Sequence, residues 1–154
     1  MAGITQECKK QLGKNQLVEQ GKAELAAKSY PDAVGTFTKA LAFDPEDEEV
    51  KALLEEAKRR AEAQRLKKIG EDQLLAKDFL KAAATLLKAL ELDNDDAVTK
   101  RERNDALNRA RALKLEKQGL AHEDAGDYAA AVRDLLEAMR LYPARHFPQI
   151  ASWH

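Results

Sequence analysis

The chain has 154 residues, with 26 Lys and Arg against 27 Asp and Glu, so its formal net charge is −1. This balance argues against general nucleic-acid binding, which normally requires a basic excess. The single cysteine, Cys8, excludes an internal disulfide framework and a cysteine-based zinc cluster. Gly and Pro are too few for a turn-rich β protein, and no apolar stretch is long enough to span a membrane. We therefore expect an all-α, cytoplasmic protein.

Taken from the N-terminus, the sequence is organised by an internal repeat of 49 residues. The same step relates glycines, aromatic residues and alanines without a gap. The recurring positions include Gly21, Gly70 and Gly119, then Tyr30, Phe79 and Tyr128, and then Ala33, Ala82 and Ala131. Such self-similarity is typical of repeat architectures. We count three repeats, about 1–45, 46–94 and 95–143, which form a single array over 1–143 followed by a tail of residues 144–154.

Each repeat predicts a long helix followed by a short one. Ser29, Asp78 and Asp127 are N-cap residue types, and each precedes an aromatic residue and a run with apolar residues three and four apart. Asp44 is expected to cap the next long helix, with Pro45 in its first turn. The expected helices are 3–27, 30–43, 46–76, 79–92, 95–125 and 128–141.

The three recurring glycines fall inside the expected long helices. A glycine in the middle of a helix costs about 1 kcal/mol relative to alanine, so its recurrence at one position needs a reason. We expect a close approach of two helices at this position. A flexible hinge is the alternative.

The repeat resembles the tetratricopeptide repeat (TPR) family, whose signature has Gly, Ala, Phe and Pro at characteristic places. The residues of the first repeat at the signature positions are Leu17, Gln20, Gly21, Glu24, Ala33, Phe37, Ala40 and Pro45. Glu24 departs from the signature, because the family has an aromatic residue at its position. This resemblance implies tandem antiparallel helix hairpins. The period of 49 exceeds the family's usual 34 by 15 residues, and the excess falls at the start of the long helices, around 48–62 and 97–111. The first half of each long helix should then pack on the preceding short helix, and the second half on the following one.

The resemblance also implies a non-catalytic scaffold that binds a protein or peptide along the face of its first helices. The positions of that face are the candidate partner-binding residues Asn15, Val18, Lys22, Gln64, Lys67, Glu71, Glu116 and Leu120. The alternative is that these residues form ordinary solvated helix surface.

Self-association is a second hypothesis. Leu53 and Leu54 lie on an apolar stripe of the second long helix, which is either intramolecular core or an interface between copies. Cys8 lies on a similar stripe of the first helix, so we expect a buried thiol there. The tail contains Phe147, Ile150 and Trp153. These three residues either fold back over the last short helix or dock on a neighbouring molecule, unless the chain is a piece of a longer array.

Catalysis is not expected. The sequence has no phosphate-binding glycine loop, no His-Glu-x-x-His and no Cys-x-x-Cys, so we expect no enzyme, no cofactor and no metal site. The basic run at 58–60 lies among acidic residues that can pair with it along a helix, and no aromatic residue interrupts it to stack a base. We expect neither nucleic acid nor a membrane as a partner.

Overall fold

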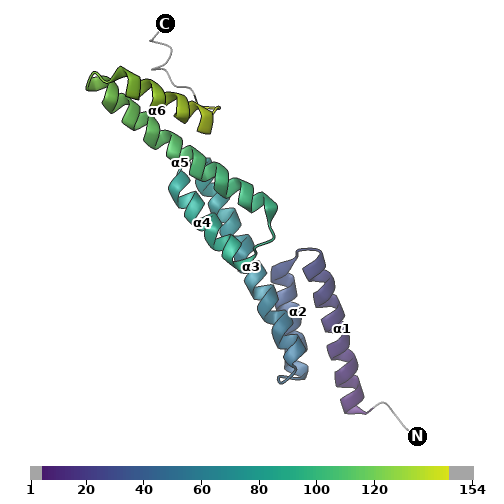
Figure 1. Cartoon of the computed structure of the whole chain (residues 1–154). Helices are drawn as coiled ribbons and strands as arrows, with labels where there is room; N and C mark the ends of the chain where they lie inside the picture. The colour runs from purple at the N-terminus through teal and green to yellow at the C-terminus, as the bar shows by residue number, and fades with distance from the viewer. Residues whose placement is uncertain (1–4, 146–154) are drawn as a thin grey trace. The chain divides into compact units, whose positions relative to one another are not determined.

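The computed structural model describes residues 5–145, and all regular structure in that range is helical (Figure 1). The helices are α1 (Gln6–Ala26), α2 (Tyr30–Phe43), α3 (Glu48–Leu75), α4 (Phe79–Leu92), α5 (Ala97–Asp124) and α6 (Tyr128–Leu141). The long helices have 21, 28 and 28 residues, whereas each short helix has 14. The all-α prediction is confirmed, and the short helices have the predicted bounds.

The long helices α3 and α5 begin two residues later than predicted, because the cap is a different aspartate. The Asp47 carboxylate accepts hydrogen bonds from the backbone N–H groups of Glu49 (3.0 Å) and Val50 (3.2 Å). Asp44 instead accepts from the N–H of Glu46 within the preceding turn. The prediction that Asp44 caps the helix was therefore wrong. An aspartate is most effective as a cap when its side chain reaches the second or third helical N–H.

The long helices end in a common left-handed turn. The residues at this position are Lys28 and Lys77, each with φ 61°, and Gly126 with φ 79°. The N–H of Ser29 donates to the carbonyl of Glu24 at 2.8 Å, and the N–H of Lys28 donates to the carbonyl of Leu25 at 3.0 Å. This pairing is a Schellman motif, which satisfies the last carbonyls of the helix. In the sequence, Gly126 alone indicates this turn, because lysine does not favour a left-handed conformation.

The chain divides into two compact units. Unit 1 contains residues 1–65 and 92–94, and unit 2 contains residues 66–91 and 95–154. The division therefore falls inside α3.

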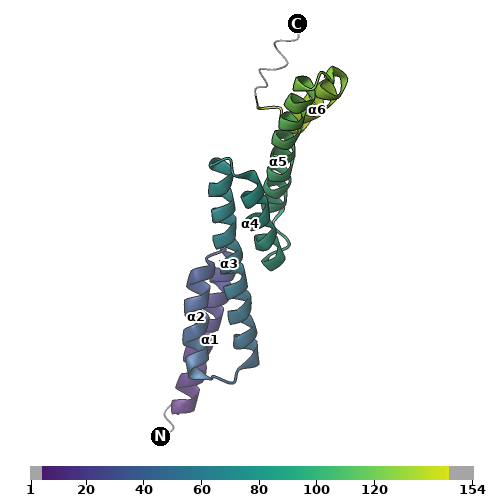
Figure 2. The ribbon, with the colours of Figure 1, turned by 90° about the vertical axis from the view of Figure 1, so that its left-hand side faces the viewer.

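In unit 1, α1 and α2 lie side by side as a helix hairpin, which Figure 1 and Figure 2 show from two directions. The buried core joins residues of α1, of α2 and of the first half of α3. Its members are Val18, Ala33, Phe37, Ala40, Val50, Leu54 and Ala57. The first half of α3 therefore packs on the preceding short helix, as the repeat period predicts.

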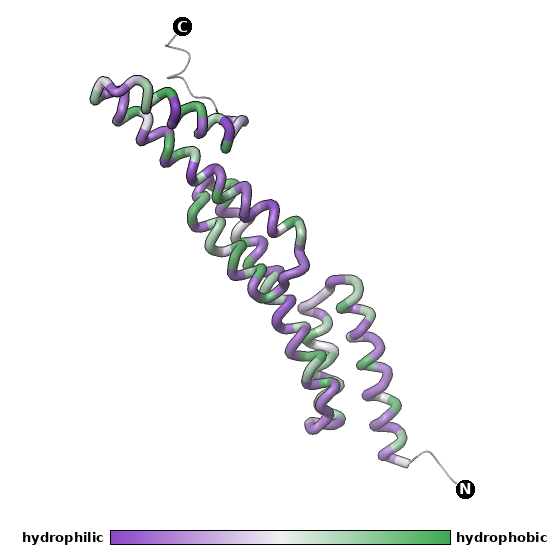
Figure 3. Tube along the Cα trace, in the orientation of Figure 1, coloured by the Kyte–Doolittle hydropathy of each residue, from purple (hydrophilic) through white to green (hydrophobic). Residues whose placement is uncertain are grey.

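In unit 2, the long helix α5 packs against two short helices, α4 and α6. Ala106, in its first half, packs with Ala82 and Ala83 of α4. Ala112, in its second half, packs with Leu135 and Ala138 of α6. Figure 3 shows the apolar residues concentrated on α2 and α4, while the long helices are largely hydrophilic. Alanines on two sides of this polar helix therefore lie at its contacts with both neighbours.

The recurring glycines mark close contacts between each long helix and the short helix that follows it. A Cβ atom on Gly21 would lie 2.5 Å from the Phe37 ring, and one on Gly70 would lie 2.6 Å from Leu86. On Gly119 it would lie 2.9 Å from Leu135. These distances confirm the predicted close approach of the helices.

Replacement of Gly21 by alanine therefore destabilises the protein, although alanine is the better helix former. Phe37 is completely buried and has no room to move, so overpacking should cost about 1–3 kcal/mol and outweigh a propensity gain of at most about 1 kcal/mol. Gly35 is the matched control, because a Cβ atom added there would have no neighbour within 4 Å. Gly35→Ala should stabilise. Urea unfolding measures both changes, and equal stabilisation by the two variants would show that Gly21 is no contact point.

Candidate functional site

Polar side chains bridge the two helices of a hairpin where the TPR signature has an aromatic residue. Thr36 of α2 donates its hydroxyl proton to the Glu24 carboxylate of α1, with oxygens 2.9 and 3.0 Å away. At the same repeat positions, His122 of α5 lies 3.5 Å from Asp134 of α6. These two pairs fix the approach of the helices by polar contact as well as by packing.

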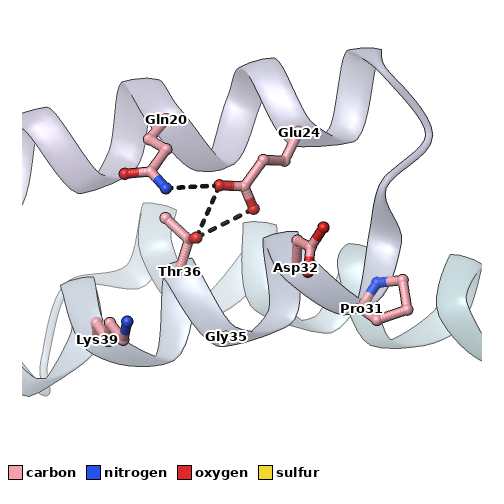
Figure 4. A pocket seen from close by; sticks show the side chains of 7 residues that line it. All are labelled: Gln20, Glu24, Pro31, Asp32, Gly35, Thr36 and Lys39. Carbon is pink, nitrogen blue, oxygen red and sulfur yellow. Dashed lines mark hydrogen bonds between the residues drawn. The ribbon is translucent and has the colours of Figure 1, made fainter.

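The Glu24 pair borders an open hollow on the surface of unit 1. Its volume is about 460 Å³, and Figure 4 shows the side chains around it. The lining residues are Gln20, Glu24, Pro31, Asp32, Gly35, Thr36 and Lys39. Gln20 donates to the Glu24 carboxylate at 2.8 Å, so this carboxylate already has two protein donors. The hollow therefore offers a polar surface on which the Glu24 carboxylate is already held by Gln20 and Thr36.

An ion pair recurs between a long helix and the turn that follows the next short helix. Lys67 donates to Asp96 at 3.1 Å, and Arg145 donates to Glu116 at 2.8 Å. Lys67 and Glu116 occupy the same repeat position. The long helix therefore contributes the positive charge to the first pair and the negative charge to the second. Burial alone would raise the pKa of Asp96, but the Thr99 N–H and the Lys67 ammonium outweigh it and lower the pKa to about 2. These pairs hold the repeats in register.

Two glutamates face each other near the Lys67 pair. Burial, together with the adjacent Glu71, raises the pKa of Glu102 above its usual range despite the nearby Lys67. One carboxylate oxygen of Glu102 is buried and has no hydrogen-bond partner among residues 5–145. A buried oxygen without a donor and a neighbouring carboxylate both disfavour the ionised form of Glu102, which is the physical cause of its raised pKa.

The predicted partner-binding residues have different surroundings. Asn15, Lys22, Gln64 and Leu120 are exposed, although Lys22 lies 3.4 Å from Glu49. Lys67 and Glu71 are half-buried in the contacts just described. Val18 and Glu116 are only 9% and 8% exposed, because the first is core and the second is ion-paired with Arg145. The structure thus leaves four of the eight open to solvent, and Val18 and Glu116 are structural residues.

The predicted self-association residues of the second repeat also contribute to the core. Leu54 is 7% exposed and belongs to the core cluster of unit 1, and Leu53 packs against that cluster. The stripe was predicted to be either intramolecular core or an interface between copies. The burial of these residues favours intramolecular core. The other three candidates, Phe147, Ile150 and Trp153, lie outside the described residues.

An arginine of each later long helix lies over the aromatic residue that begins the preceding short helix. The guanidinium carbon of Arg60 is 6.0 Å from the centre of the Tyr30 ring. That of Arg109 is 5.7 Å from the centre of the Phe79 ring, and it also lies 4.7 Å from Tyr142. Cation–π contacts of this kind extend the alanine packing between the helices. These contacts were not predicted, although the two arginines recur with the 49-residue period.

The last short helix, α6, exposes a face whose counterparts on the earlier short helices are buried or half-buried. Tyr128 is 64% exposed, whereas its equivalents Tyr30 and Phe79 are 6% and 3% exposed. Val132 and Met139 are 37% and 39% exposed, and the matching residues of α4 are 5% exposed. In α2 and α4 this face is covered by the first half of the next long helix. Within residues 5–145, no such helix covers α6.

The first turns of α1 show the complementary situation. Cys8 is exposed, and Leu12 is 55% exposed. The prediction of a buried thiol was therefore wrong. The matching residues Ala57 and Ala106 are completely buried, because each packs on a preceding short helix. In the described residues, α1 has no short helix before it.

No described helix is long and apolar enough to cross a membrane. In residues 5–145, no group of three or more His, Cys, Asp or Glu side chains is arranged to hold a metal ion.

No family model, no curated protein and no solved structure matches this chain. The resemblance to TPR proteins therefore rests on the repeated residues themselves.

Replacing Glu102 by glutamine should stabilise the protein at neutral pH. The folded state holds a proton on Glu102 more tightly than the unfolded chain does, so stability falls as pH rises from the unfolded pKa through the folded one. Removing the charge should recover about 0.5 kcal/mol at pH 7, and the gain should vanish near pH 4. Thermal unfolding across this range measures the effect. Glu91→Gln, at an exposed position of α4, is the control, and a gain independent of pH would contradict the assignment.

Proposed function

We propose that this chain is a non-catalytic protein-interaction module built from three TPR-like helix hairpins. The repeated Gly, Ala, aromatic and Leu positions support this proposal. So does the packing inside each unit, where the predicted small residues lie at the helix contacts. Partner recognition then depends on helix faces rather than on a reactive site.

The exposed face of α6, made of Tyr128, Val132 and Met139, carries the proposal. Large apolar side chains at least one-third exposed on one side of a helix are typical of interfaces. The face formed by the first helices is the weaker candidate, because Val18 is in the core and Lys67 is held by Asp96.

The covered counterparts of this face indicate what kind of partner it fits. On α2 and α4 the occupant is one side of a polar helix with small apolar residues, such as Ala57 and Ala106. We therefore assign to the α6 face an amphipathic helix with apolar residues three and four positions apart.

Selection of phage-displayed random 16-residue peptides on the folded full chain tests this function. Enriched peptides should have the amphipathic helical pattern. Their binding should weaken at least tenfold when Val132 and Met139 are both replaced by lysine, because the apolar contact is lost. The matched control replaces Leu75 and Leu80, two leucines of the same unit that are 84% and 71% exposed but lie off this face. Equal binding to both double variants, or no enriched peptide, would contradict the proposal.

A further inference from the structure

We propose that the helix received by the α6 face is the beginning of α1 from a second copy of this chain, so that copies associate head to tail. This inference rests on the proposed function of the α6 face and names its occupant. It follows from two surfaces that the structure leaves open and that the repeat period relates to each other.

The first step is the identity of the covering segment in the earlier repeats. The face of α2 is covered by the first half of α3 through Val50, Leu54 and Ala57. The face of α4 is covered by the first half of α5 through Ala106. By the same 49-residue step, residues 55–61 of α3 and 104–110 of α5 correspond to the first turns of α1, residues 6–12, while Leu54 corresponds to Thr5 just before the helix.

The second step is the chemistry of that segment. Cys8 stands at the position of Ala57 and Ala106, and Leu12 at that of Ala61 and Ala110. Cys8 and Leu12 are exposed and lie one turn apart on one side of α1. In α3 and α5 both positions are alanine, the first buried and the second half-buried, and α1 has a thiol and a larger leucine in their place. The first turns of α1 therefore present an exposed apolar stripe of the same period.

The third step is the register of the contact. Arg60 lies over Tyr30 and Arg109 lies over Phe79, so these positions meet whenever the contact forms. The corresponding pair is Gln11 of one copy and Tyr128 of the next. Glutamine lacks the positive charge of arginine, so this contact is weaker than its intramolecular counterparts.

Head-to-tail contacts join two different surfaces and leave one of each free at the ends of every assembly. Two copies that associate through one helix face also lose rotational and translational freedom, which costs free energy. The contact between α2 and α3 does not have this cost, because the turn at 44–47 joins the two helices covalently. We therefore expect weak, concentration-dependent growth in mass rather than a stable dimer.

Light scattering of the full chain under reducing conditions, from about 1 µM to 1 mM, tests the inference. The average mass should rise above the 17.1 kDa of one chain. The average mass should stay at that of one chain in the variant with lysine at Val132 and Met139. It should also stay there in the variant with lysine at Cys8 and Leu12. The control with lysine at Leu75 and Leu80 should grow like the unmodified chain. Circular dichroism checks that each variant is folded.

The most decisive measurement mixes the variant altered at Val132 and Met139 with the variant altered at Cys8 and Leu12. Each retains one intact surface, so an equimolar mixture should form a pair of twice 17.1 kDa and nothing larger. A symmetric interface or general stickiness does not complement in this way. If the mixture stays at one chain while the unmodified protein grows, the inference is overturned.

A gain-of-function variant tests the register. Gln11→Arg restores the arginine of the intramolecular contacts and should tighten association about 2- to 5-fold, the range of an exposed cation–π contact. The gain should disappear when Tyr128 is also replaced by alanine. A gain that survives Tyr128→Ala would place the arginine elsewhere and contradict the register.

Other occupants give different results. If the mass rises only after residues 146–154 are removed, the tail covers the α6 face, and the inference is overturned. If the chain stays at one copy up to 1 mM while selected helical peptides still bind α6, the inference fails and the proposed function stands. If replacing Val132 and Met139 by lysine also leaves the affinity for the selected peptides unchanged, the proposed function fails too.

Discussion

The contact between a glycine of a long helix and a large buried side chain of the next short helix is the constraint on which the rest of the structure depends. Phe37, Leu86 and Leu135 are completely buried against helices that carry no side chain at the point of contact. This approach fixes the rotation of each long helix. Its glycine side faces the following short helix, and its other side is left for the preceding one.

Two-sided burial explains how long, hydrophilic helices are held with so few apolar residues. Alanines such as Ala57 and Ala106 bring the helix backbone close to the preceding short helix, and an arginine stem and guanidinium cover its aromatic residue. Ion pairs then connect each long helix to the next turn. Where the described repeats stop, the same design leaves one uncovered side on α1 and one uncovered face on α6, and both proposals depend on these two surfaces.

Much of the fold was predictable because the determining signals are local. The short helices follow from apolar spacing and from cap residues such as Asp127, whose carboxylate does accept from Ala130. Three features were not predictable. Lys28 and Lys77 adopt a left-handed conformation that their type does not favour. The Lys67–Asp96 pair joins residues 29 apart in sequence. Cys8 follows the pattern of a core residue but has no partner helix among the described residues. A periodic pattern shows which side of a helix can be buried, and it does not show whether another helix covers that side.

One repeat position is buried in α3 and α5 but exposed in α1. Urea unfolding of Cys8→Asp, Ala57→Asp and Ala106→Asp, measured at low protein concentration, tests it most directly. Because a buried unpaired charge is costly, the two alanine variants should each lose about 3 kcal/mol or more of unfolding free energy. Cys8→Asp should stay within about 0.5 kcal/mol of the unmodified chain. Comparable losses in all three variants would contradict the account.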